Sequence, residues 1–290
     1  MRRPGKLPTG IEARASIDHV PGGSGANQAA WLGSLGVRVS LASRVGAADH
    51  AYHGALLRSY GVRPLLSVDP ELDTGRIVCL VDEGGERTFL TDRGAGVRAP
   101  ELSVDLVDEV SLVHVSGYAL FAPPARQPIL DFLARATRAG VPCTVDPGSA
   151  SFLTEAGAAA FLEWTRAATA CFPNVEEARV LSGETEPEEQ LRALTPWYDT
   201  VAVKLGAGGA MAASRCGSPV RVPAADVRPV DSTGAGDAFC AGFLAAYVAG
   251  VSLGDCLAEA VALGGRAVTR PGGRPDRGGA QRPATHPRSR

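Results

Sequence analysis

The sequence predicts an α/β protein with a mostly parallel sheet, helices on both faces of that sheet, and a small additional β-sheet. Two observations predict this class. Between residues 111 and 206, short apolar strands alternate with helical segments, which is typical of parallel strands joined by helices. Between residues 74 and 91, two strand-like runs flank a Gly-Gly turn, the pattern of a β-hairpin.

The predicted elements follow one another in a regular order. A first helix starts near Gly25 and ends at Gly36, and residues 37–41 then alternate as a strand. After the hairpin come strands at 111–116, 141–146, 170–174 and 200–206, and helices at 126–139, 158–168 and 176–181. Strand and turn are expected at 222–230, before a helix at 238–247. Right-handed crossovers bring the strand ends to one edge of the sheet, where ligands bind.

Composition narrows the class of protein. The chain has 290 residues, of which 45% are apolar and 21% charged, as in an ordinary globular enzyme. The net charge of −2 argues against a nucleic-acid partner, and no apolar run is long enough for a membrane span. The N-terminus does not read as a secretory signal, and the scattered cysteines indicate reduced thiols, so we expect a cytoplasmic protein. His50 and His53 lack further metal ligands nearby.

The most informative segment is Asp231-Ser232-Thr233-Gly234-Ala235-Gly236-Asp237, a glycine-rich turn that opens into a tightly packed helix. Backbone N–H groups at a helix start are unpaired, and the helix dipole adds partial positive charge, so this turn predicts an anion pocket. A carboxylate beside such a pocket suits a base that takes a proton from a nucleophile attacking a phosphate. A capping Asp with turn glycines is the structural alternative.

A second glycine-rich segment, Gly22-Gly23-Ser24-Gly25-Ala26-Asn27, starts the first predicted helix. Its glycines allow close approach of a small polar ligand, and Asn27 offers donors and acceptors to hydroxyl groups. The segment also resembles a loose dinucleotide fingerprint, which would indicate a dehydrogenase. Against that alternative, residues 12–20 form a weak strand at best, and the strand after the helix ends in Ser43-Arg44 rather than in an acidic residue.

Together the two segments resemble the signatures of the ribokinase-like (PfkB) carbohydrate kinases. The resemblance covers residues 7–275 and implies that Asp237 is the catalytic base. It further implies that the Gly234–Gly236 backbone stabilises the transferring phosphoryl group, and that Gly22, Gly23 and Asn27 contact the sugar. No P-loop motif is present, which argues against a P-loop kinase.

The same resemblance implies roles for residues at other strand ends. Asn174 and Glu177 match a motif that binds magnesium and the nucleotide phosphates, with Glu177 acting through water. From the residues alone, these two also read as a strand-to-helix turn with an acidic first turn. Lys204 and Gly206 match the nucleotide-binding loop, although the residue at the Lys204 position differs among family members.

A monovalent-cation site is implied in the C-terminal part. Asp231 and Thr233 match positions that contribute to such a site in some members, and residues 270–273 match its second half. The expected cofactors are therefore ATP and Mg²⁺, with K⁺ as a further candidate. The expected partners are a small-molecule sugar and ATP, and the resemblance allows a homodimer formed through the lid.

The expected kinase domain spans residues 1–275, with lid segments near 7–20 and 73–92, and residues 276–290 read as a disordered tail. Three departures from the family pattern stand out. The family begins with a hydrophobic strand that ends in a sugar-binding Asp, and this sequence lacks it, since Asp18 lies too close to Gly22. It therefore looks N-terminally truncated. Gly96 stands where members often have Asn, and the tail replaces the usual final helix.

The sequence therefore predicts an ATP-dependent kinase that phosphorylates a primary hydroxyl of a small sugar. Two alternatives within the same fold are a nucleoside kinase and an inactive or weakened protein that binds a sugar or a nucleotide. The dehydrogenase is the third alternative.

Overall fold

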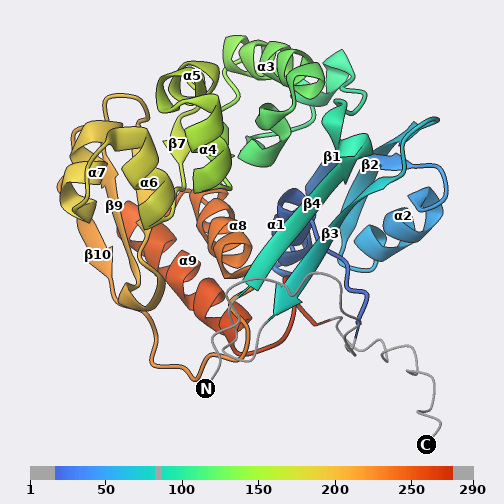
Figure 1. Cartoon of the computed structure of the whole chain (residues 1–290). Coiled ribbons are helices and arrows are strands. Elements are labelled where there is room, and N and C mark those ends of the chain that lie inside the picture. The colour runs from blue at the N-terminus through green and yellow to red at the C-terminus, as the bar shows by residue number, and fades with distance from the viewer. Residues whose placement is uncertain (1–16, 82–86, 277–290) are drawn as a thin grey trace, which may run out of the picture.

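A six-stranded sheet with helices on both faces forms the larger part of the fold (Figure 1). The computed structural model describes residues 17–81 and 87–276. In the sheet, β5 to β8 run parallel, and β9 and β10 extend it in antiparallel register, in the order β10-β9-β8-β7-β6-β5. These strands are β5 (Val113–Ser116), β6 (Cys143–Asp146), β7 (Ala170–Cys171), β8 (Thr200–Lys204), β9 (Ala210–Ser214) and β10 (Val220–Val222).

Alternate residues of these strands point into two apolar cores, one on each face. Val145, Val201 and Val203 belong to one core and Ala202 and Ala212 to the other, as the period of two in a strand requires. The first core is covered by α3 (Pro123–Arg138), α4 (Ala150–Ala156), α5 (Ala158–Trp164), α6 (Val175–Ser182) and α7 (Pro187–Leu194). The second is covered by α8 (Ala235–Val248) and α9 (Leu253–Val268).

Helix α1 (Ser24–Ser34) packs against α8 through the fully buried Trp31. On its other side lies a separate two-stranded parallel sheet made of β1 (Val39–Gly46) and β2 (Val62–Asp69), which α2 (His50–Arg58) connects. Within the described residues, β5 and β1 are not paired. The start of α1 lies between them, because a Cβ built on Gly25 would lie 3.7 Å from Ser116 Cβ and 3.8 Å from Leu41 Cδ1.

The hairpin forms a small sheet of its own from β3 (Thr74–Val81) and β4 (Arg87–Gly94). Asp69 ties its two connections together at the base. The buried carboxylate accepts hydrogen bonds from the backbone N–H groups of Glu71 and Leu72 before β3, and from Arg98 just after the 3₁₀ turn η1 (Ala95–Val97) that follows β4. These bonds hold the pKa of the Asp69 carboxyl below its usual range despite burial.

The predicted fold class is confirmed, with corrections to individual elements. The strand and turn expected at 222–230 are wrong beyond Val222, since residues 223–229 have no regular structure. Pro223 and Pro229 lie in this stretch and have no N–H group for a strand ladder. Helix α8 begins at Ala235, three residues before the predicted start at 238.

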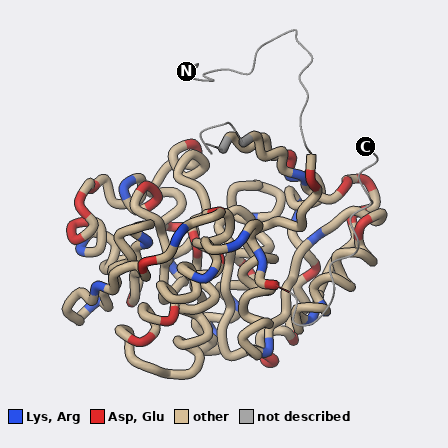
Figure 2. The backbone as a smooth tube through the Cα atoms, turned by 90° about the horizontal axis from the view of Figure 1, so that it is seen from below, with Lys and Arg blue, Asp and Glu red and all other residues tan. Residues whose placement is uncertain are grey.

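Some predictions fall outside the described residues. These are the Gly-Gly turn at residues 84–85, residues 7–16 of the lid segment expected near 7–20, and residues 277–290 of the expected tail. Residues 17–20 have no regular structure. No helix within the described ranges is long and apolar enough to cross a membrane. Acidic and basic positions are interspersed along the backbone tube (Figure 2).

Candidate active site

The two glycine-rich helix starts meet at one carboxylate, Asp237, in the first turn of α8. Ser24 Oγ donates to Asp237 Oδ1 at 2.7 Å, across 213 positions of sequence. Asn27 Nδ2 donates to Asp237 Oδ2 at 2.9 Å. Both donors lie in the first turn of α1, so the fold brings the two sequence signatures into direct contact.

The surroundings of Asp237 prepare it to accept a proton. Burial raises the pKa of its carboxyl from 3.8 to about 6, and the hydrogen bonds from Ser24 and Asn27 oppose this shift. The negative charge of Asp146 raises this pKa further. The resulting group is ionised near neutral pH, yet it is a better proton acceptor than an ordinary aspartate. That is the property required of a general base.

The glycines of the α8 turn differ in what surrounds them. Gly234 caps the helix at a φ of 74°, and a Cβ there would lie 2.4 Å from Gly273 Cα. Glycine is therefore required at 234 by the backbone itself. A Cβ on Gly236 would meet only Lys204, 3.5 Å from Nζ and 3.9 Å from Cδ. The absence of a side chain at 236 leaves space beside the helix start.

A buried ion pair lies beneath this turn. Lys204 Nζ, at the end of β8, is 2.9 Å from Asp146 Oδ1, at the end of β6. Gln28 Nε2 donates to Asp146 Oδ2 at 3.0 Å. Sequence reasoning identified Lys204 but missed Asp146 and Gln28. A signal was available, because Asp146 ends a buried strand at the same sheet edge and Gln28 directly follows Asn27.

Asn174 and Glu177 form a capping box at the start of α6. Glu177 N donates to Asn174 Oδ1 at 2.9 Å, and Asn174 N donates to Glu177 Oε2 at 2.8 Å. The strand-to-helix turn that the sequence offered as an alternative role for this pair is thus present in the fold. The capping box uses one oxygen of each side chain. Glu177 is buried, and burial raises the pKa of its carboxyl while the charge of Lys204 lowers it.

The other predicted residues lie in two places. Gly206 begins the 3₁₀ turn η4 (Gly206–Gly208) just after β8, with a φ of 59°. Asp231 connects two loops, since Oδ1 accepts from Thr233 N at 2.8 Å and Oδ2 accepts from Gly272 N at 2.9 Å. Asp231 precedes α8 and Gly272 follows α9, so this hydrogen bond brings the two halves of the expected monovalent-cation site together.

Arg274 extends the site toward α1 and was not anticipated. Its Nε donates to Asn27 Oδ1 at 3.1 Å and its Nη2 to the Gly22 carbonyl at 2.8 Å. Asn27 is consequently held from both sides, by Asp237 and by Arg274. Gly23 caps α1 with a φ of 91°, and its carbonyl accepts from Asn27 N at 2.8 Å. No motif marks Arg274, which follows Gly273 in a loop.

The hairpin reaches the same edge of the sheet. Arg93 of β4 donates a hydrogen bond to the carbonyl of Tyr118, in the 3₁₀ turn η3 (Gly117–Phe121) that follows β5. Burial raises the pKa of the Tyr118 hydroxyl to about 12, and the charges of Glu177, Asp146 and Asp237 add to this shift. The hydrogen bond from Arg93 therefore joins the hairpin to the turn that follows β5.

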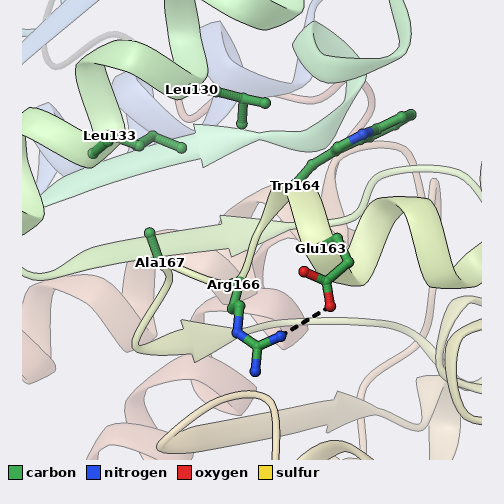
Figure 3. A pocket seen from close by; sticks show the side chains of 7 residues that line it. Leu130, Leu133, Glu163, Trp164, Arg166 and Ala167 are labelled. Atoms are coloured by element: carbon green, nitrogen blue, oxygen red, sulfur yellow. Dashed lines mark hydrogen bonds and ion pairs between the residues drawn. The ribbon is translucent and has the colours of Figure 1, made fainter.

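Within the described ranges, no cluster of three or more His, Cys, Asp or Glu side chains forms a metal cage. A hollow of about 460 Å³ lies elsewhere, between α3 and the end of α5 (Figure 3). It is lined mainly by apolar side chains, with Glu163 and Arg166 paired at 2.9 Å on one side. None of the residues discussed above lines it, so it is not part of this site.

Comparisons of the sequence with known proteins agree on one family. The sequence profile of the pfkB family carbohydrate kinases matches residues 6–277. An ATP-dependent ribose-1-phosphate kinase of Halopiger xanaduensis is 33% identical over 267 residues, which are 87% of this chain and 82% of that protein.

Solved structures agree with this. The adenosine kinase of Sinorhizobium meliloti superposes with a TM-score of 0.82 at 28% identity, covering 88% of this chain and 79% of that one. The fructokinase of Vibrio cholerae O395, solved with fructose, ADP and a calcium ion, superposes with a TM-score of 0.77 at 26% identity, covering 87% and 86%.

Proposed function

We propose, from the premise that the chain belongs to the pfkB family of carbohydrate kinases, that it transfers the γ-phosphoryl group of ATP to a primary hydroxyl of a small sugar. Enzymes of this family are phosphotransferases that act on sugar hydroxyls. The observation that carries the finer proposal is the contact of Asp237 with Asn27 and Ser24. It supports a base and a hydroxyl-binding side chain at one position, beside an anion-binding helix start.

In the proposed reaction, Asp237 accepts the proton of the sugar hydroxyl while the hydroxyl oxygen attacks the γ-phosphorus of ATP. The phosphorus–oxygen bond to the β-phosphate breaks, and ADP leaves. The backbone N–H groups of the Gly234, Ala235 and Gly236 turn stabilise the negative charge on the transferring group. Gly22, Gly23 and Asn27 orient the sugar. The open space beside Gly236 supports this placement.

Asn174, Lys204 and Gly206 are the proposed nucleotide contacts, since all lie at the ends of β7 and β8. Glu177 fits a magnesium ion that arrives with the nucleotide and is held partly through water. Mg²⁺ usually binds one or two carboxylates together with phosphate oxygens, so a complete protein cage is not needed. Bound there, the ion would neutralise charge on the phosphates. Asp231 and Thr233 would hold a monovalent cation, with K⁺ as the candidate.

We assign residues 1–275 to one kinase domain, with the β3–β4 hairpin as its lid. The lid carries apolar side chains on both faces. Val78 and Leu90 are a cross-strand pair on one face, and Cys79 and Phe89 on the other, and Val78, Phe89 and Leu90 are each more than half exposed. A homodimer that buries the lid face carrying Phe89 would account for the exposure on that face. Sedimentation analysis of Phe89→Lys beside the parent chain tests it.

A nucleoside kinase is the second candidate, favoured by the superposition on an adenosine kinase at 28% identity. The aromatic ring of Tyr118 would suit stacking against the nucleobase of such a substrate. A weakened or inactive binding protein of the same fold is the third.

One assay separates these candidates. The purified chain with Mg²⁺·ATP is offered ribose, fructose, ribose 1-phosphate and adenosine, and ADP formation is followed together with ³¹P NMR of the product. We expect a phosphomonoester on a CH₂ group with one of the sugars, and none with the deoxy analogue of that sugar that lacks the phosphorylated primary hydroxyl. Turnover with adenosine alone would select the nucleoside kinase. Thermal stabilisation by ATP without any turnover would select the inactive protein.

A further inference from the structure

The Lys204 side chain lies between Asp146, with which it forms an ion pair, and Gly236, which has no side chain. Its ammonium is 2.9 Å from Asp146 Oδ1, and its side chain is only 13% exposed. The same nitrogen is 3.5 Å from the point where a Cβ on Gly236 would stand. The ammonium is therefore adjacent both to Asp146 and to the first turn of α8, where the phosphoryl group is proposed to bind.

The balance of charge in this site is negative. The carboxyl groups of Asp146, Glu177 and Asp237 act on one another electrostatically, and the charge of Lys204 acts on all of them. A nucleotide adds further negative charge to this site. Because Coulomb interactions are strong where water is excluded, the nucleotide needs a cation close to its phosphates.

Asp146 is also held from its other side. Gln28 Nε2 donates to Asp146 Oδ2, and the same nitrogen is 3.2 Å from Ser24 Oγ. The other amide atom of Gln28, Oε1, is buried without a hydrogen-bond partner among the described residues. The position of Asp146 therefore does not depend on Lys204 alone, so the lysine can leave while the carboxylate stays in place.

We propose that the Asp146–Lys204 ion pair is an exchangeable clamp: the ammonium leaves Asp146 when nucleotide binds and donates to the transferring phosphoryl group beside Gly236. This inference rests on the proposed kinase function and names Lys204 as a catalytic residue of it. Breaking a buried ion pair is unfavourable when one charge is left alone. The exchange therefore requires a ligand that brings an anion for Lys204 and a cation for the site, as Mg²⁺·ATP does.

The clamp predicts an unusual effect of removing Asp146. In Asp146→Asn, Lys204 has no carboxylate partner, so it is available to phosphate without Mg²⁺. We expect the Kd of the non-hydrolysable ATP analogue AMP-PNP in excess EDTA, measured by calorimetry, to fall about tenfold relative to the parent chain, the size of one charge-assisted hydrogen bond. In Lys204→Met the Kd of AMP-PNP with Mg²⁺ rises about tenfold, because the donor to the γ-phosphoryl group is gone.

The double variant Lys204→Met/Asp146→Asn is the control. It replaces both charges with side chains of similar size, which buried pairs often tolerate, and circular dichroism melting checks that it folds. We expect it to lose the gain in AMP-PNP affinity, because that gain belongs to Lys204. If the double variant keeps the gain, or if Asp146→Asn shows none, the clamp is wrong and the pair only holds the two strands together.

Binding of AMP-PNP is measured without any acceptor, so the result does not depend on knowing the sugar. Failure of the parent chain to bind AMP-PNP, with or without Mg²⁺, would overturn the kinase proposal itself and this inference with it. Normal binding of Mg²⁺·AMP-PNP by the parent chain, with affinities unchanged in all variants, would overturn only the clamp.

Discussion

The starts of α1 and α8 face the same carboxylate but contribute to it in different ways. At α1 the glycines are uncrowded, since a Cβ on Gly22 would meet nothing within 4 Å, and the side chains of Ser24 and Asn27 make the contacts. At α8, Gly234 is packed against Gly273, and the helix presents backbone N–H groups together with Asp237. The first start supplies adaptable side chains and the second a fixed backbone. A glycine motif therefore has to be interpreted residue by residue.

The largest effect is expected from the acceptor on α8. Asp237→Asn removes the proposed base while keeping its size, so kcat should fall about 10²–10⁴-fold, the usual contribution of a general base. Binding of Mg²⁺·ADP, measured by calorimetry, should be retained. A variant with near-normal kcat would mean that Asp237 only joins α8 to Ser24 and Asn27 of α1.

The two glycines of the α8 turn should separate stability from activity. Alanine at 234 requires a positive φ and meets Gly273, so Gly234→Ala should cost about 2–4 kcal/mol of unfolding free energy. In Gly236→Ala the new methyl group contacts only the side chain of Lys204, so the melting temperature should be unchanged. The methyl group would occupy the space proposed for the phosphoryl group, so kcat should fall about 10²-fold.

These two variants control for each other in one experiment that measures melting temperature and kcat together. Equal losses of stability in both would show that the contrast between a packed and an open glycine is mistaken.

A smaller effect is expected on the α1 side. Asn27→Ala removes one hydrogen bond to a sugar hydroxyl, worth about 0.5–1.5 kcal/mol, and should raise KM for the sugar roughly 2- to 13-fold. KM for ATP should change less. The reverse order of effects would move the Gly22–Asn27 segment to a nucleotide site and favour the dinucleotide alternative.

The smallest effect concerns Ser24 and pH. A protonated Asp237 cannot accept a proton, so kcat/KM for the sugar should fall about tenfold per pH unit below a pKa of about 6. The hydrogen bond from Ser24 lowers this pKa, so Ser24→Ala should move the acidic limb to higher pH. Threonine at the same position keeps the hydroxyl and serves as the matched control. A limb that stays in place would show that Ser24 does not tune the base.

Stability should respond to the same group in the opposite sense. Because the folded state raises the pKa of Asp237 from 3.8 to about 6, the native chain binds more protons than the unfolded chain between these values. The contribution of Asp237 to stability is therefore complete below about pH 4 and is lost as the pH rises through about 6. Asp237→Asn should remove this slope from the pH dependence of the melting temperature.

The sequence supports a proposed role for residues that lie inside a local motif. Asp237 and Asn27 lie inside glycine motifs at helix starts, so roles could be proposed for them without a fold. Asp146 ends an unremarked apolar strand, and Arg274 lies in a loop. Their roles come from contacts with Lys204 and Asn27, more than 50 and 240 positions away, which no local pattern records.

The fold shows the same division. Alternating apolar runs predicted β5 to β8 and three of the helices between them, α3, α5 and α6, whereas α4 and α7 were not predicted. Strand β9, Ala-Met-Ala-Ala-Ser, lacks the branched residues that indicate strands, and only its place beside β8 makes it one. Helix α9 contains Gly264 and Gly265, which weaken the local signal, and its packing against α8 compensates.

The distance of 213 positions between Ser24 and Asp237 has a consequence for how the protein is made. At about 5–20 residues per second, translation separates the two helix starts by roughly 10–40 s. During that interval, α1 and the parallel strands can form, but the nascent chain lacks the proposed base and the proposed phosphoryl turn. On the proposed mechanism, the polypeptide on the ribosome cannot transfer a phosphoryl group until α8 leaves the exit tunnel and docks against α1.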